Sequence, residues 1–220
     1  MKNVFDFIKK LEKNNNREWF AENKSDYEKV KKEFKSFSLQ LSDLMVKHDN
    51  VDPKPHIFRI HRDIRFSKDK TPYKTHMSGS FKRLTPMLRG GYYYHLEPGG
   101  SFLGGGFWGP SKEDLQHLRL QIQQDADPLR EVINSKEFKN YFGELKGDKL
   151  KTAPKGFDKE DPNVDLLRHK GFIVSQSFTD KEVLASDFHE KLSEGFKNMR
   201  PFFDVMSDYL TTNLNGESII

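Results

Sequence analysis

The sequence predicts an α+β protein, in which a central antiparallel sheet (about residues 55–110 plus 171–177) is flanked by N- and C-terminal helices. Three observations lead to this prediction. Apolar residues recur every three or four positions near both ends of the chain, and they alternate with polar residues in the middle. Turn residues separate neighbouring strand-like runs. The 19 Phe, 7 Tyr and 2 Trp among 220 residues supply enough apolar area for a core.

The N-terminal segment predicts two helices. Apolar residues from Val4 to Leu11 share one face of the first helix, and Asn15 with Glu18 forms a variant of the capping box that starts the second. This second helix is long and amphipathic and runs to about His48, with its apolar face formed by Tyr27, Val30, Phe34, Phe37, Leu41 and Leu44. We interpret the Lys and Glu residues of this helix as a solvated face without a function.

The middle of the chain predicts strands. Pro53 and Pro55 disfavour a helix, and from Phe58 to Phe66 apolar and polar residues alternate. A turn with proline at its second position follows at Glu97–Gly100. The strands expected around it are Met77–Lys82, Gly91–Leu96 and Ser101–Trp108. Neighbouring strands of this kind pair in antiparallel fashion.

The C-terminal half returns to helical spacing at Ser111, with shorter helices over 127–142 and a long surface connection over 143–162. Phe172–Gln176 predicts one more strand. Two further helices are expected, one starting at the capping box of Thr179 and Glu182 and one starting at Pro201. With no internal repeat and no linker, we expect one domain over residues 1–220.

The positive charge is local. The chain has 37 Lys and Arg against 33 Asp and Glu, a formal charge of +4, and residues 59–76 alone contribute six cations less two acids. The other residues hold 31 of each sign. Such a local excess favours a binding partner with negative charge. There is no apolar run of about 20 residues, no secretory signal pattern and no cysteine, so we expect a cytoplasmic protein with no membrane contact.

The familiar cofactor motifs do not fit. Gly104, Gly106 and Gly109 match the dinucleotide spacing, but the strands before and after them do not form a βαβ unit, and Pro110 replaces the lysine of a phosphate-binding loop. His95 and Glu97 have the spacing of a zinc deaminase signature without its cysteines. The spacing of His61 and His76 is not typical of a metal site either. We therefore expect no cofactor and no metal.

The basic stretch itself predicts an anion site. In an extended strand, alternate residues project from one face about 6–7 Å apart, which suits a phosphate or carboxylate with several oxygens. Asp63 can hold one guanidinium by a two-bond pair, and Pro72 stiffens the following loop. The alternative is an edge strand whose cations prevent aggregation. The expected anion-binding residues are Arg59, Arg62, Arg65, Lys68, Lys70, Tyr73 and Lys74, extended by Lys155, Arg168 and Lys170 if the last strand lies near the first.

Arg62 has the parity of the apolar side of that strand, where an unpaired guanidinium would be costly. We expect it to pair with an acid from a distant segment, and Glu18 beside Trp19 is the best candidate. Removal of one partner from a buried pair costs about 3–5 kcal/mol.

Three functions are compatible with these residues. The first is a binding domain for a phosphate-bearing or other anionic small molecule, with nucleic acid a less favoured ligand. The second is a metal-independent enzyme acting on phosphoryl or acyl groups, with Asp63 or His61 as the general base. The third is an interaction module for acidic partners, anchored by Tyr92, Tyr93, Tyr94, Phe107 and Trp108, although sheet packing also explains these rings.

The same segments resemble an uncharacterised bacterial family, the domain of unknown function twenty-four sixty-one. The resemblance rests on 15–20, 62–74, 91–98, 154–157 and 166–170, and it spans nearly the whole chain. One departure lies at Glu160-Asp161-Pro162, where the family pattern has a His before the Pro. The resemblance implies a single-domain extent and no particular reaction.

Overall fold

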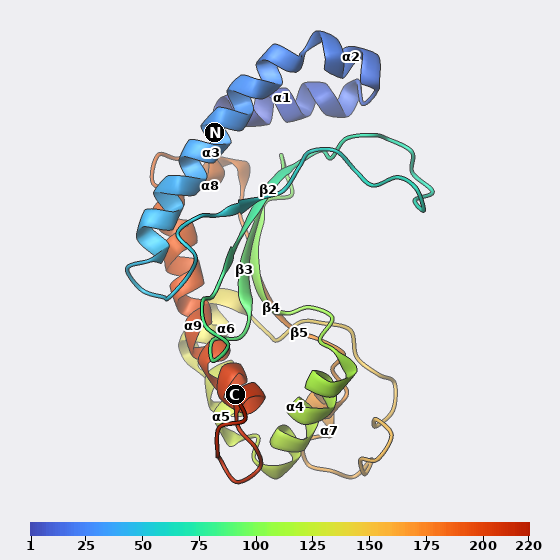
Figure 1. Ribbon diagram of the computed structural model, residues 1–220, viewed down its shortest axis with the longest axis vertical. Coiled ribbons are helices and arrows are strands. Elements are labelled where there is room, and N and C mark those ends of the chain that lie inside the picture. Colours follow the sequence, from blue (N-terminus) through green and yellow to red (C-terminus); the bar gives the residue numbers. More distant parts are fainter.

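The computed structural model describes residues 1–220 and confirms the α+β prediction. A five-stranded antiparallel sheet has the order β1-β2-β3-β4-β5 and lies between N-terminal and C-terminal helices (Figure 1). The strands are β1 (His56–Ile57), β2 (Met77–Lys82), β3 (Gly91–Leu96), β4 (Phe102–Phe107) and β5 (Phe172–Ser177). The helices are α1 (Lys2–Lys13), α2 (Arg17–Glu22), α3 (Lys24–Met45), α4 (Lys112–Gln124), α5 (Asp127–Asn134), α6 (Lys136–Phe142), α7 (Val164–Leu167), α8 (Asp180–Val183) and α9 (Phe188–Thr211).

The strand pairing follows the order of the chain. β2 and β3 pair with Met77 opposite Leu96, and the turn predicted at Glu97–Gly100 joins β3 to β4. β5 pairs with β4 only after a long excursion that contains α4 to α7. β1 and β5 consequently form opposite edges of the sheet.

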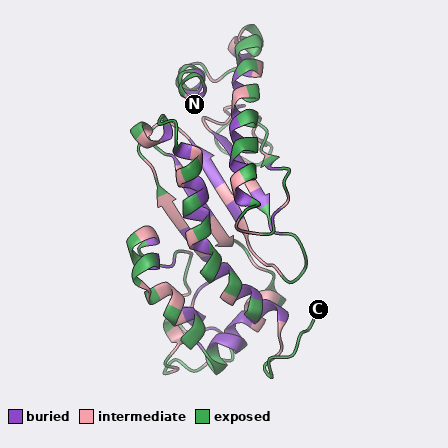
Figure 2. Ribbon diagram, turned by 90° about the vertical axis from the view of Figure 1, so that its left-hand side faces the viewer, coloured by how far each residue is buried: buried purple, intermediate pink, exposed green.

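The two faces of the sheet have different surroundings. α3 and α9 cover one face and run along it in front of the strands in Figure 2, with their outward surfaces exposed. Tyr94 crosses β2 at Gly79, where a Cβ would lie 2.2 Å from the tyrosine oxygen, and its hydroxyl donates to Ser38 of α3 at 2.7 Å. The other face is concave and lies between a projecting loop above and α4 below (Figure 1).

A buried ionic network ties α9 to the sheet. The guanidinium of Arg83, just beyond β2, is 2% exposed, and its Nη2 donates to Asp204 of α9 at 2.7 Å. Its Nε lies 2.8 Å from Asp49, although not along a hydrogen-bond direction. Asp49 also accepts from the hydroxyl of Tyr92. Burial acts to lower the pKa of Arg83, but the bond to Asp204 and the charge of Asp49 together raise it.

The strand predicted from Phe58 to Phe66 is wrong. The strand β1 ends at Ile57, before this stretch begins, and within the stretch only His61 forms a bridge, an isolated one to Tyr73. Residues 62–72 form the projecting loop. The alternating apolar residues of this stretch therefore do not form a continuous buried face, and the Phe66 side chain is 96% exposed. Side-chain bonds inside the loop replace the ladder hydrogen bonds that a strand would need.

Two helix boundaries also differ from the predictions. The capping box of Thr179 and Glu182 is present, but its helix ends at Val183 and α9 starts afresh at Phe188. Pro201 lies inside α9 instead of starting a helix, because apolar residues on both sides of it pack against the sheet and outweigh the lost hydrogen bond. None of the helices has the length and apolar composition needed to cross a bilayer.

Candidate functional site

A cationic hollow of about 660 Å³ lies between the helices α2 and α3, the strand β1 and the root of the projecting loop. Apolar and aromatic side chains form part of its lining, among them Phe20, Tyr27 and Met77. Five basic side chains and one acid, Glu28, complete the charged lining. The five cations are Arg17, Lys24, Lys31, Lys35 and Arg59.

The lysines reach this hollow because of their spacing on α3. Lys24, Glu28, Lys31 and Lys35 follow one another at steps of four, three and four, so they form one stripe along the helix. Five cations less one carboxylate give a formal +4, as large as the charge of the whole chain. Lys31 pairs with Glu28 at 3.7 Å, and none of the other four cations takes part in an ion pair.

This stripe was not predicted, because the charges of the long helix were interpreted as a solvated face without a function. A signal was present in the repeated spacing of Lys24, Lys31 and Lys35. Two residues that were predicted for the anion site, Arg59 and Tyr73, do line the hollow, as does His61.

Asn15, which lies between α1 and α2, binds the root of the projecting loop at Tyr73. Its side-chain amide donates to the carbonyl of Tyr73 at 2.9 Å, and its oxygen accepts from the Tyr73 amide at 3.1 Å. The Tyr73 ring stacks on Phe20 of α2 at a centroid distance of 4.0 Å. Asn15 is therefore not the N-cap that was predicted, and the cap of α2 is Asn16, which accepts from the Trp19 amide at 2.8 Å.

The arginines of the projecting loop are engaged within it. Arg62 binds Asp69 and Thr71, and the prediction that it pairs with the exposed Glu18 is wrong. The amide of Thr71 and the guanidinium of Arg62 lower the pKa of Asp69 to about 2. Because this segment is a loop and not a strand, the alternation of its residues does not place Arg62 on a buried face, and Arg62 needs no acid from a distant segment.

The second loop arginine confirms a prediction. Arg65 donates to both carboxylate oxygens of Asp63, at 2.9 and 2.6 Å, and its hydrogen bond lowers the pKa of this carboxyl group. An acid that is paired and easily ionised is a poor general base at neutral pH. His61 contacts different groups, because its ring lies against the rings of Phe20 and Tyr73 at the root of the loop.

The lysines of the loop differ in their surroundings. Lys70 donates to the carbonyl of Ile64 at 2.9 Å, and the exposed Lys68 forms no ion pair. Lys74 lies with its ammonium 5.5 Å from the centre of the Phe58 ring. Burial, together with the charge of Arg59, lowers the pKa of Lys74. The root of the loop therefore holds cations without an internal counter-charge.

The second basic region does not join this surface. It precedes β5, which forms the edge of the sheet opposite to β1, so the condition under which the two regions would merge is not met. Arg168 donates to the carbonyl of Leu150 at 2.6 Å, Lys155 is exposed, and Lys170 lines a different hollow.

That second hollow, of about 990 Å³, lies on the concave face of the sheet. Its floor is open because glycines replace side chains on β4, while Lys146 and Lys170 stand at its side and the Trp108 ring is 85% exposed at its rim. Three of the rings expected as protein-binding anchors, Tyr92, Tyr94 and Phe107, are buried on the helix side and cannot contact a partner.

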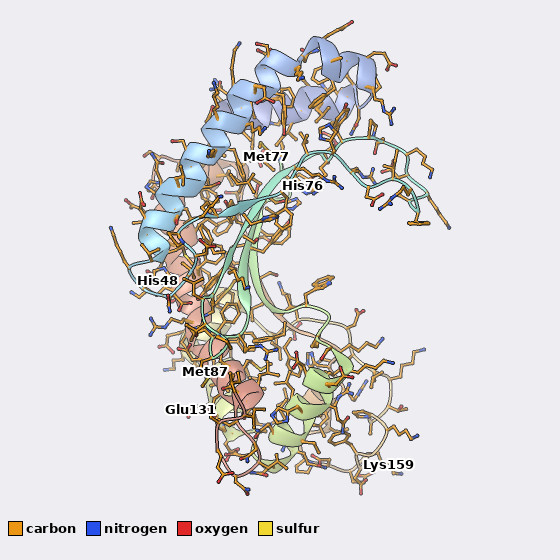
Figure 3. The ribbon with its side chains drawn as sticks, viewed as in Figure 1. His48, His76, Met77, Met87, Glu131 and Lys159 are labelled. Atoms are coloured by element: carbon orange, nitrogen blue, oxygen red, sulfur yellow. The ribbon has the colours of Figure 1, made fainter.

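Three side chains of the types that ligate metals, His76, His95 and Glu97, come together beside this hollow. His76 lies where the projecting loop returns to the sheet (Figure 3), and His95 and Glu97 follow on β3 and just beyond it. One ligand atom of each lies within 4.8 Å of the others. Burial and the neighbouring His95 lower the pKa of His76 to about 4. The sequence predicted no metal site and considered His76 only together with His61, whereas the strand register brings His76 close to His95.

A comparison with protein-family models tests the family resemblance that the sequence motifs suggested. The model of a conserved hypothetical protein family, DUF2461, matches residues 3–205. The chain belongs to this family. The match covers both hollows and the histidine cluster. No curated protein and no solved structure matched the chain.

Proposed function

We propose that the protein binds a phosphate-bearing small molecule in the cationic hollow between α2, α3 and the root of the projecting loop. The observation that carries this proposal is the concentration of five cations around one carboxylate in that hollow. Like charges that converge without counter-charges destabilise a folded protein, and a bound anion removes that cost.

The composition of the lining favours phosphate over a general acidic surface. Arg17 comes from α2 and Arg59 from the segment after β1, and each guanidinium offers a planar set of donors that suits phosphate oxygens. The lysines of α3 add charge along one wall. Phe20, Tyr27 and Tyr73 supply apolar surface for an organic group attached to the phosphate.

The walls of the hollow are held before a ligand arrives. The two hydrogen bonds between the Asn15 side chain and the Tyr73 backbone, and the stacking of Phe20 on Tyr73, fix the root of the loop against the N-terminal helices. A site that needs little reorganisation loses less entropy when it binds. The loop arginines, Arg62 and Arg65, serve to shape the loop and contribute less to ligand contact.

The test is calorimetric titration with inorganic pyrophosphate and, separately, with a thymidine oligonucleotide at the same phosphate concentration. We expect pyrophosphate to bind, and the double substitution Arg59→Gln with Lys35→Gln to weaken binding at least tenfold. Binding should weaken as salt rises, because ion contacts are screened. The control is Lys151→Gln with Lys159→Gln, two exposed lysines; Lys159 lies at the far end of the molecule (Figure 3).

Absence of pyrophosphate binding up to millimolar concentrations, or equal binding by the two double variants, would overturn the proposal. Oligonucleotide binding that is tighter than that of pyrophosphate and is lost in the Arg59 and Lys35 variant would move the ligand to nucleic acid.

A further inference from the structure

We infer that His76, His95 and Glu97 form a binding site for a divalent transition-metal ion such as Zn²⁺ or Fe²⁺. The site is independent of the cationic hollow, and it lies on the other face of the sheet. Met77, which lines the hollow, has the opposite strand parity to His76.

The register of β2 and β3 brings the three side chains together. Met77 pairs with Leu96 and Ser78 with His95, so the next position along the ladder places His76 opposite Glu97. Residues 76, 95 and 97 therefore project from the same face of the sheet. The rings of His76 and His95 lie 3.9 Å apart between centroids.

The donor atoms have the separation that one ion requires. Nε2 of His95 lies 3.1 Å from Oε2 of Glu97. Two ligand atoms that are each about 2.1 Å from a common metal stand about 3.0–3.4 Å apart at octahedral or tetrahedral angles. The third donor, from His76, lies within 4.8 Å of both and needs a small rotation of the ring to complete the set.

Neighbouring groups hold these ligands in place. The hydroxyl of Thr75 donates to Oε1 of Glu97 at 2.8 Å, which leaves Oε2 facing His95. Nδ1 of His95 lies 3.1 Å from the Tyr93 hydroxyl, and the His95 ring stacks on Phe102. Metal-binding histidines and carboxylates commonly have such outer partners, which fix their orientation.

Metal binding requires only a change of tautomer at His95. Without an ion, Nε2–H donates to Glu97 and Nδ1 accepts from Tyr93. With an ion on Nε2, the ring proton moves to Nδ1 and the Tyr93 oxygen accepts it, because a hydroxyl serves in either role. The hydrogen bonds at the far side of the ring are thus kept in both states.

The position of the cluster leaves room around an ion. Tyr93 and Phe102, which contact His95, also line the glycine-floored hollow of about 990 Å³. Two imidazoles and one carboxylate fill three positions, and tetrahedral or octahedral ions need one or three more. Water or a ligand in the concave face can supply them. Imidazole with carboxylate selects Zn²⁺ or Fe²⁺ over Ca²⁺ or Mg²⁺, which prefer oxygen ligands.

The experiment is titration of the metal-free protein with Co²⁺ in a phosphate-free buffer, followed by visible absorption, and with Zn²⁺ by calorimetry. We expect one equivalent of Co²⁺ to bind with the ligand-field bands of a nitrogen and oxygen site. His76→Gln, His95→Gln and Glu97→Gln should each weaken binding at least tenfold. The matched control is His56→Gln, an exposed histidine on β1 outside the cluster.

A second measurement protects the test against variants that fold poorly. In the wild-type protein, Zn²⁺ at about one hundred times its Kd should raise Tm by about 5–10 °C, and a chelator should reverse the rise. Paramagnetic Co²⁺ should broaden the amide signals of Thr75 and Leu96. Failure of the wild type to take up one equivalent, or unchanged uptake by all three cluster variants, would overturn the inference.

Discussion

The substitution Arg83→Met tests whether the buried ionic network holds α9 on the sheet. Arg83 is 2% exposed, and its guanidinium donates to Asp204, Asp49, Ser207 and the carbonyl of Arg89. Methionine keeps much of the apolar volume and removes every donor. The carboxylate of Asp49, whose side chain is 5% exposed, would then be buried with the Tyr92 hydroxyl as its remaining neighbour in the network.

The expected loss of stability follows from which charge is left behind. Breaking a buried ion pair by removing one partner costs about 3–5 kcal/mol. For a chain of this length, each kcal/mol lowers Tm by about 2–4 °C, so the loss corresponds to about 6–20 °C. Asp204 is half exposed and regains water, so most of the cost comes from Asp49.

The measurement is urea unfolding followed by circular dichroism, with Arg65→Met as the control. Arg65 also forms a two-bond pair, with Asp63, but its side chain is 76% exposed, and such pairs contribute about 0–1 kcal/mol. Adding Asp49→Asn to Arg83→Met should recover part of the loss, because it removes the orphaned charge. If Arg83→Met unfolds within 1 kcal/mol of the wild type, the network does not hold the helix.

Two further outcomes follow from the structure. Arg62→Met should change the free energy of unfolding by less than about 1 kcal/mol in the same assay, because its partner Asp69 belongs to an exposed loop. A loss of about 3 kcal/mol would instead indicate that Arg62 forms a buried ion pair. Burial lowers the pKa of His169 to about 4, so the unfolded chain binds its proton first as pH falls below about 6.5, and stability should drop by on the order of 3 kcal/mol between pH 6.5 and 4. His169→Gln should reduce the slope in unfolding measured at several pH values but not abolish it, because His76, whose pKa is also lowered to about 4, adds to it in the same range. A slope that His169→Gln leaves unchanged would show that His169 does not contribute.

Much of the fold was predictable because periodicity and turn chemistry act locally. The hairpin at Glu97–Gly100, the strand at Phe172 and the end of the long helix were predicted near their observed positions, although the helix predicted from Asn15 is divided into α2 and α3 at Asn23. The prediction failed where distant packing decides the conformation. Pro201 stays helical because its neighbours are buried against the sheet, and the stretch from Phe58 to Phe66 lacks a partner strand along most of its length.

The candidate sites were less predictable, because they depend on which segments meet in space. The local charge excess indicated the loop and correctly predicted that Arg59 and Tyr73 belong to a cationic site. Most cations of the hollow come from α3, however, and their spacing along the helix does not by itself show that β1 lies beside them. The buried guanidinium was expected at Arg62 and exists at Arg83. The cluster of His76, His95 and Glu97 depends on the register of β2 with β3, which the spacing of residues within one strand does not reveal.

The place of β5 in the sheet also sets the order in which the chain can fold. Five residues separate β3 from β4, whereas 64 residues separate β4 from β5. By the loop-closure relation, joining the ends of the longer segment costs about 2 kcal/mol more in chain entropy. The β2–β3–β4 meander can therefore form early from local contacts, and β5 completes the sheet only after α4 to α7 have condensed and shortened the path. A nascent chain would accordingly assemble the histidine cluster before it finishes the hollow beside it.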